Sequence, residues 1–140
     1  MKKKVLITVR GEQFYEGTDP GRTNLITEGE LSDTKEGWRI RYQEADENGM
    51  PGTTTTFDVQ PERVILRRSG SLNSEMIFEK GRPHSSLYAL SAGALTVDIH
   101  TDYLFADIDG DGGEMDIRYQ IAIEHQLTGS NRFLIQVKTK

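Results

Sequence analysis

Two stretches in the C-terminal half of the chain alternate between apolar and polar residues, and an acidic, glycine-rich segment separates them. In residues 95–105 the apolar or threonine side chains occupy every odd position, and in residues 115–123 the odd positions are again apolar. Successive side chains of a strand point to opposite faces, so a period of two over this length predicts long, half-buried strands. The acidic segment 107–113 is then the expected turn of a β-hairpin.

A hairpin centred on that segment makes specific predictions about which side chains face the core. The expected cross-strand neighbours are Phe105 with Met115, Tyr103 with Ile117, and Asp102 with Arg118. This register places Tyr103 and Phe105 in the core and Asp102 on the wet face. A slip of one residue would reverse the faces of a whole strand, so we expect the parity to be strongly specified.

The remaining chain shows no helical period and consists of short alternating or β-branched runs. We expect strands over residues 5–10, 23–32, 38–43, 53–59, 63–69, 75–79, 84–91 and 133–137. Asp19-Pro20-Gly21 and Asn48-Gly49 are turn signals, because these residues suit the backbone angles of tight turns. Gly29 is a candidate bend or bulge, and residues 127–131 are the expected last loop.

Eight to ten short strands with brief connections predict an all-β fold in which neighbours are antiparallel. A meandering β-barrel over residues 1–140, forming one domain, fits best because full closure removes exposed sheet edges. A β-sandwich is the alternative.

Composition narrows the class of protein further. The chain has 140 residues and no cysteine, which fits a reducing cytoplasm and excludes thiolate chemistry. Residues 1–10 are basic and then apolar, but the apolar run is short and no small-residue cleavage site follows it. No run approaches the roughly 20 apolar residues of a membrane span. The net charge of −5 argues against a nucleic-acid partner.

Several local motifs, taken in order, resemble the YwiB-like family of uncharacterised bacterial β-barrel proteins, a domain of unknown function. The motifs are Met50-Pro51-Gly52-Thr53-Thr54-Thr55, Arg68-Ser69-Gly70, Phe78-Glu79-Lys80-Gly81, Leu87-Tyr88, Gly93-Ala94-Leu95, Thr101, Gly113 with Met115-Asp116-Ile117-Arg118-Tyr119, and residues 131–137. The chain has Leu90-Ser91-Ala92-Gly93 where the family is expected to have a Thr-Pro-aromatic-Gly turn. The resemblance implies a lipocalin-like, calycin-type barrel in a bacterial cytoplasm, and it carries over no catalytic residue.

Two groups of acidic residues are candidate metal sites. Residues 107–112 match the first half of a calcium loop, but Arg118 stands where the bidentate glutamate should be. Asp98, His100 and Asp102 share one strand face, which suits a transition metal only if the ligands converge. We expect a solvated turn and a wet outer face, hence no metal and no cofactor.

Arg68 is the most informative charged residue. Its strand face also carries Val64 and Leu66, which are plausible core positions. An inward guanidinium needs an anionic partner, because an unpaired buried charge is costly. Either Arg68 pairs with Glu75 or Glu79 near a barrel end, the interpretation favoured here, or it binds an anionic ligand.

Three functions remain open from the sequence. The leading hypothesis is non-catalytic binding of a small amphipathic or anionic molecule at a barrel end. The candidate ligand-binding residues are Arg68, Trp38, Tyr42, Phe78, Tyr88, Tyr103 and Tyr119. The aromatic members could line a pocket or simply fill the interior. The second hypothesis is a protein-interaction module that uses the outer barrel face, and the third is a hydrolytic enzyme, although no catalytic residue stands out.

Overall fold

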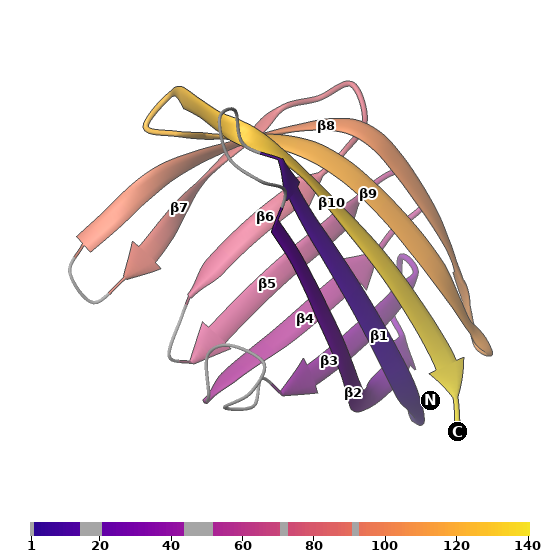
Figure 1. Ribbon diagram of the computed structural model, residues 1–140. Coiled ribbons are helices and arrows are strands. Elements are labelled where there is room, and N and C mark those ends of the chain that lie inside the picture. The colour runs from indigo at the N-terminus through magenta and orange to yellow at the C-terminus, as the bar shows by residue number, and fades with distance from the viewer. Residues whose placement is uncertain (1, 15–20, 44–51, 71–72, 91–92) are drawn as a thin grey trace.

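Ten β-strands make up the computed structural model, which is shown in Figure 1. It describes residues 2–14, 21–43, 52–70, 73–90 and 93–140, with residues 87–90 described by their backbone alone. The strands are β1 (Lys2–Phe14), β2 (Gly21–Asp33), β3 (Trp38–Gln43), β4 (Thr53–Val59), β5 (Val64–Gly70), β6 (Ser74–Phe78), β7 (His84–Leu90), β8 (Gly93–Asp109), β9 (Gly112–Ile123) and β10 (Gln126–Thr139). Within these described ranges there is no helix long and apolar enough to cross a membrane.

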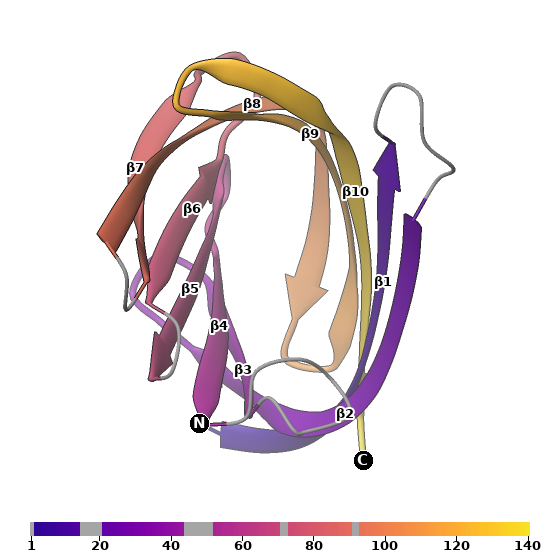
Figure 2. The ribbon, with the colours of Figure 1, turned by 60° about the vertical axis from the view of Figure 1, so that its left-hand side comes forward.

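All ten strands belong to one antiparallel sheet. Its order is β6-β5-β4-β3-β2-β1-β10-β9-β8-β7, so every neighbour is also a chain neighbour except the pair β1 and β10. The two sheet edges, β6 and β7, lie side by side in Figure 2, and a single bridge joins Lys80 to Thr101 at this seam. The sheet is therefore a nearly closed, up-and-down barrel, which confirms the predicted all-β antiparallel barrel of eight to ten strands.

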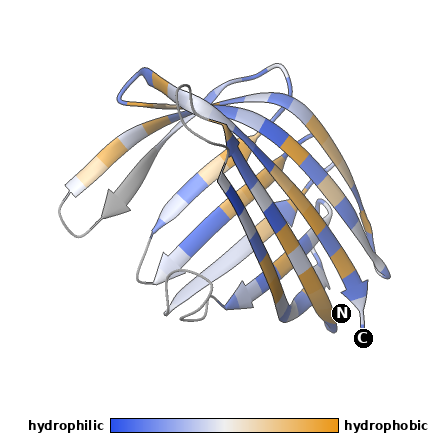
Figure 3. Ribbon diagram, viewed as in Figure 1, coloured by the Kyte–Doolittle hydropathy of each residue, from blue (hydrophilic) through white to orange (hydrophobic). Residues whose placement is uncertain are grey.

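The barrel has two walls of different length. β2, β1, β10, β9 and β8 are neighbours in the sheet and have 12 to 17 residues each; we call them the long wall. β3, β4, β5, β6 and β7 have 5 to 7 residues each and form the short wall. Figure 3 shows the alternation of apolar and polar residues as bands along the strands of the long wall.

Apolar side chains from both walls fill the interior. The largest fully buried ones include Phe57, Phe78, Ile7, Leu31, Ile40, Leu66, Ile99, Met115, Ile117 and Ile135. The ring of Phe78 lies 4.7 Å from that of Tyr119 and 6.5 Å from that of Phe133, measured between centroids. This cross-barrel aromatic cluster packs β6 of the short wall against β9 and β10 of the long wall.

The predicted faces of the central hairpin are correct for β9 and for the first half of β8, and wrong for the second half of β8. Thr101 pairs with Tyr119 as alternation requires, but the next pair is Tyr103 with Arg118, so Asp102 is an extra residue in a β-bulge. Beyond it, Leu104 takes the inner position opposite Ile117. Tyr103 and Phe105 point outward and are 40% and 41% exposed, instead of lying in the core.

Three local predictions are also corrected. The turn between β8 and β9 has only two residues outside the ladder, Gly110 and Asp111, because Asp109 pairs directly with Gly112. Residues 127–131 belong to β10, and the chain reverses instead at Glu124 and His125, whose φ values are 52° and 68°.

Gly29 is not a bulge, because the pairing of β2 with both neighbours is continuous there. A Cβ on Gly29 would lie closest to the backbone carbonyl oxygen of Arg41, and it would lie 2.5 Å from Cδ1 of Ile7 and 3.2 Å from Cβ of Tyr42. The glycine therefore makes room for the backbone of β3 and for two core side chains. The predicted turns at residues 19–21 and 48–49 lie wholly or largely outside the described residues.

The bulge can be tested by comparing Ile117→Ala with Tyr103→Ala. Ile117 is fully buried, so its truncation should lower the free energy of unfolding by about 2–5 kcal/mol. Tyr103 loses only an exposed contact with Arg118, worth about 1 kcal/mol or less. Urea denaturation measures both, and equal losses would mean that Tyr103 faces the core.

Candidate functional site

The structure separates the predicted ligand-binding residues. Tyr42, Phe78 and Tyr119 are buried in the core, and Trp38 packs against it from the end of β3. Tyr103 lies on the outer face, and the side chain of Tyr88 lies outside the described residues. Tyr42, Phe78 and Tyr119 therefore contribute to filling the interior, and Arg68 is left as the candidate with a charged group to offer.

Arg68 sits in a row of polar residues that crosses the short wall. It follows Val64 and Leu66 on the inner face of β5 and is partly buried. Its cross-strand neighbours are Thr55 on β4 and Ser74 on β6. The hydroxyl oxygen of Thr53, one inner-face position further along β4, is buried and has no hydrogen-bond partner among the described residues. This end of the short wall is polar on its inner side.

The carboxylates that could have paired with Arg68 are engaged elsewhere. Glu75 accepts a hydrogen bond of 2.9 Å from Nε of Arg67, and Oε1 of Glu79 lies 3.1 Å from Nε2 of His84. Within the described part of the chain, no ion pair involves Arg68. The favoured interpretation, an internal pair with Glu75 or Glu79, is therefore wrong.

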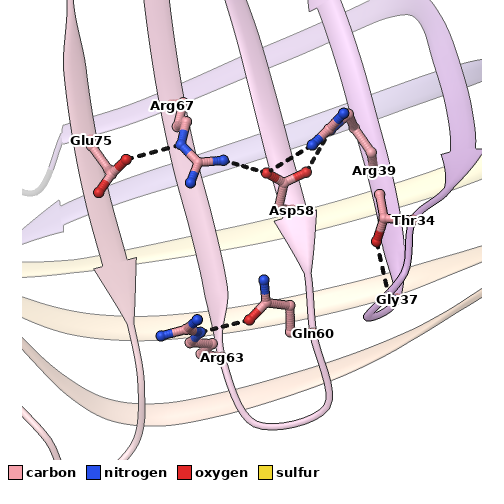
Figure 4. A network of polar contacts seen from close by, with 8 residues as sticks. All are labelled: Thr34, Gly37, Arg39, Asp58, Gln60, Arg63, Arg67 and Glu75. Atoms are coloured by element: carbon pink, nitrogen blue, oxygen red, sulfur yellow. Dashed lines mark hydrogen bonds and ion pairs between the residues drawn. The ribbon is translucent and has the colours of Figure 1, made fainter.

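An ion-pair network covers the outer face of the short wall (Figure 4). Nε of Arg39 donates to Oδ1 of Asp58 at 2.7 Å, and Arg67 donates from Nη1 to Oδ2 of the same carboxylate and from Nε to Glu75. The Asp58 side chain is only 8% exposed, whereas the two arginine side chains are 46% and 45% exposed. The carboxylate raises the pKa of Arg39, first through the hydrogen bond and then through its charge.

Strand alternation explains why these groups meet. Arg39 lies opposite Asp58 across β3 and β4, and Arg67 lies opposite Glu75 across β5 and β6. The chain supplies a single acidic residue within β4, Asp58, and its immediate strand neighbours are apolar. Sequence reasoning missed this network, although an isolated acid in a strand flanked by arginine-bearing strands was an available signal.

Arg68, the arginines of the ion-pair network and their polar neighbours line a groove of about 400 Å³, which we call the arginine groove. It begins near the end of β5 and crosses the outer face of the short wall. Its lining residues are Arg39, Arg41, Thr54, Thr56, Asp58, Arg67, Arg68, Ser69, Asn73, Ser74 and Glu75. Every one of them is polar, and four arginines stand against two carboxylates.

The acidic side chains of the two candidate metal sites do not converge on a common point. Oδ2 of Asp98 lies 2.8 Å from Nδ1 of His125, while Asp102 lies beside His100 and accepts a hydrogen bond from Gln120. In the 107–113 segment the ammonium of Lys3 donates to the carbonyl of Gly110 at 2.8 Å. No group of three histidine or acidic residues that could hold a metal ion occurs within the described ranges.

One cluster on β7 and β8 has the residue types of a hydrolase but not the connectivity. Ser85 donates to Oδ1 of Asp98 at 2.5 Å, and His125 contacts the other oxygen of the same carboxylate. The hydrogen bond from Ser85, followed by that from His125, lowers the pKa of Asp98. In a catalytic triad the histidine lies between serine and acid, whereas here the acid lies between the other two.

A second polar network lies on the outer face of the long wall. Arg132 donates to both oxygens of Asp116, at 3.1 and 2.9 Å, and Arg118 adds a bond of 3.2 Å. The guanidinium carbon of Arg118 also lies 4.8 Å from the ring centroid of Tyr103. The hydrogen bond from Arg132 is the largest cause of a lowered Asp116 pKa, which burial opposes and Arg118 reinforces.

The fold and the groove define a ten-stranded, up-and-down antiparallel barrel with a charged, arginine-rich outer face on its short wall. The chain belongs to the family described as "Domain of unknown function (DUF1934)", whose profile matches residues 7–135. It is similar in fold to the ywiB protein from Bacillus subtilis, with a TM-score of 0.86 and 19% sequence identity. That alignment covers 99% of this chain and 93% of the chain in the crystal structure. A comparison with curated proteins finds no match.

The Asp116 network predicts a defined part of the acid sensitivity. The folded-state pKa of Asp116 is lowered, so its contribution to stability is complete above the unfolded-state pKa, near 4, and is lost as pH falls through the folded-state pKa. Asp116→Asn should therefore flatten the fall in unfolding free energy below about pH 4. Urea denaturation at a series of pH values measures this slope.

The matched control is Asp107→Asn, an exposed carboxylate on β8 for which the described residues offer no ion-pair partner. This variant should keep the slope of the parent protein. An unchanged slope in Asp116→Asn would contradict the assignment.

Proposed function

We propose that the protein is a non-catalytic binding protein for a small anionic molecule, which it takes into the arginine groove at the end of β5. The observation that carries the proposal is that Arg68 lines this groove without an ion-pair partner in the described part of the chain. A partly buried guanidinium is stabilised when an anion pairs with it, so its partner is the ligand.

The charge of the groove supports an anionic ligand. Four arginines and two carboxylates leave a local excess of two positive charges in a chain whose net charge is −5. Asp58 and Glu75 are already bonded to arginines, which leaves Arg41 and Arg68 available. Arginine presents a planar fork of N–H donors, the geometry that carboxylates and phosphates accept.

The lining favours an anionic rather than an amphipathic ligand. The groove offers hydroxyl groups from Thr54, Thr56 and Ser69, and its apolar surface comes only from the methyl and methylene groups of polar side chains. The barrel interior is occupied by core side chains, so a buried tail would have to displace them. The volume of the arginine groove, about 400 Å³, falls within the range of small-molecule pockets, about 300–1,000 Å³.

A thermal-shift titration with inorganic phosphate, pyrophosphate and citrate tests the proposal. At least one of these probes should raise the Tm of the parent protein in a concentration-dependent way, because a ligand that binds only the folded state stabilises it. Arg68→Met should abolish the shift and change the unfolding free energy of the free protein by no more than about 0.5 kcal/mol.

Arg82→Met is the control, because it removes the same charge from an exposed turn outside the groove. It should leave the shift intact. If Arg68→Met instead destabilises the free protein by several kcal/mol, Arg68 serves an internal pair and the proposal fails. The proposal also fails if the parent protein responds to none of the three probes.

A further inference from the structure

The outer face of the long wall carries apolar side chains where a barrel would ordinarily present polar ones. Tyr103 and Phe105 reach this face because of the bulge at Asp102, and Leu134 lies two strands away from Phe105 in the same cross-strand row. Ile26 on β2 is 67% exposed. A hollow of about 230 Å³ runs between the two aromatic rings, Leu134 and Arg10.

We propose that this face is the contact surface for a second copy of the chain, paired about a two-fold axis that lies along β10. Such an axis superposes β1 of one copy on β9 of the other, and β2 on β8. An interface of this kind requires the face to be complementary to itself, residue i meeting residue j and j meeting i.

The charges on either side of β10 meet that requirement. One cross-strand row contains Arg10, Leu134 and Asp116, and the next contains Glu12, Arg132 and Arg118, in the order β1, β10, β9. The charges on β1 are thus positive then negative, and those on β9 are negative then positive.

The two-fold axis therefore brings Arg10 opposite Asp116 of the second copy, and Glu12 opposite Arg118 of the second copy. Each of these contacts occurs twice in the dimer. Arg132 lies on the axis and faces its own copy, but its charge is compensated by its bidentate bond to Asp116 within the chain.

The apolar side chains fit the same axis. Leu134 lies on it and meets its own copy. Phe105 on β8 falls over Asn24 on β2 of the second copy, one outer-face position along the strand from the exposed Ile26, and Tyr103 falls over Arg22. Arg118 holds the ring of Tyr103 by a cation–π contact while Asp116 holds Arg118, so this part of the surface is ordered before the copies meet.

Sedimentation velocity over a range of protein concentrations measures the dimer. The parent chain should dimerise reversibly, and Phe105→Ser should raise the dimer Kd at least about tenfold, because it removes a large aromatic side chain that the second copy covers. Ile77→Ser is the matched control, because Ile77 is a partly exposed apolar residue of β6 on the short wall, outside this face, and it should leave the Kd unchanged.

A charge exchange tests the axis itself. Glu12→Arg and Arg118→Glu should each weaken the dimer, and the double variant should recover most of the loss, because the pair is restored with its signs reversed. Circular dichroism and urea denaturation confirm that each variant is folded. Glu12 and Arg118 also flank Arg132 within one chain, so the contact between copies is shown by a recovery of the dimer Kd that exceeds any recovery of the unfolding free energy.

A parent chain that stays monomeric at every concentration overturns the proposal. A dimer that survives Phe105→Ser, or a double variant no stronger than the single ones, assigns the contact to another surface or another axis. These outcomes are independent of the arginine groove, which lies on the opposite wall.

Discussion

The pairing of β1 with β10 is the contact on which the barrel depends. Each of the other ladders joins strands that follow one another in the chain, so each is closed by a short connection. β1 and β10 lie at the two ends of the sequence, and ten residue pairs from Val5–Thr139 to Phe14–Ser130 hold them together. Without this ladder the sheet would divide into two separate meanders, because the described pairing across the seam is a single bridge from Lys80, which follows β6, to Thr101 of β8.

The long wall and the short wall meet at the β2–β3 and β7–β8 ladders, and they differ in what they show to solvent. The outer face of the short wall is held by ion pairs centred on Asp58, and no ion pair among the described residues involves Arg41 or Arg68, which also line the arginine groove. The outer face of the long wall is held by the Asp116 network, and it leaves aromatic rings exposed. A ligand on one wall and a protein on the other would therefore not compete for the same residues.

Alternation along the chain predicted most of the strands because a buried inner face imposes a strict period of two. All eight of the expected runs, from residues 5–10 to 133–137, fall wholly or largely within observed strands, and β3 and β4 match residue for residue. Alternation could not locate the bulge at Asp102, since the odd positions of 95–105 remain apolar across it and a regular strand would satisfy the same pattern. It also could not pair Arg68, because a charged partner depends on which strands become neighbours.

The burial of Asp58 is a second feature that alternation along the chain could not predict. Its burial results from two arginines that reach it from strands on both sides, Arg39 from β3 and Arg67 from β5. Nothing in the local sequence of β4 distinguishes this carboxylate from one in contact with water. The sheet order supplies that information, and the sheet order follows from the sum of all the local turns.

Because Asp102 is an extra residue in β8, the hairpin is sensitive to the loss of one residue at this position. Deletion of that one residue would leave β9 and the turn at Gly110–Asp111 in place, yet it would turn the rest of β8 over. The rings of Tyr103 and Phe105 would move into the barrel, and Leu104 and Ile108 would face water instead. A single codon gained or lost there would replace one surface with another, while every side chain involved kept its identity.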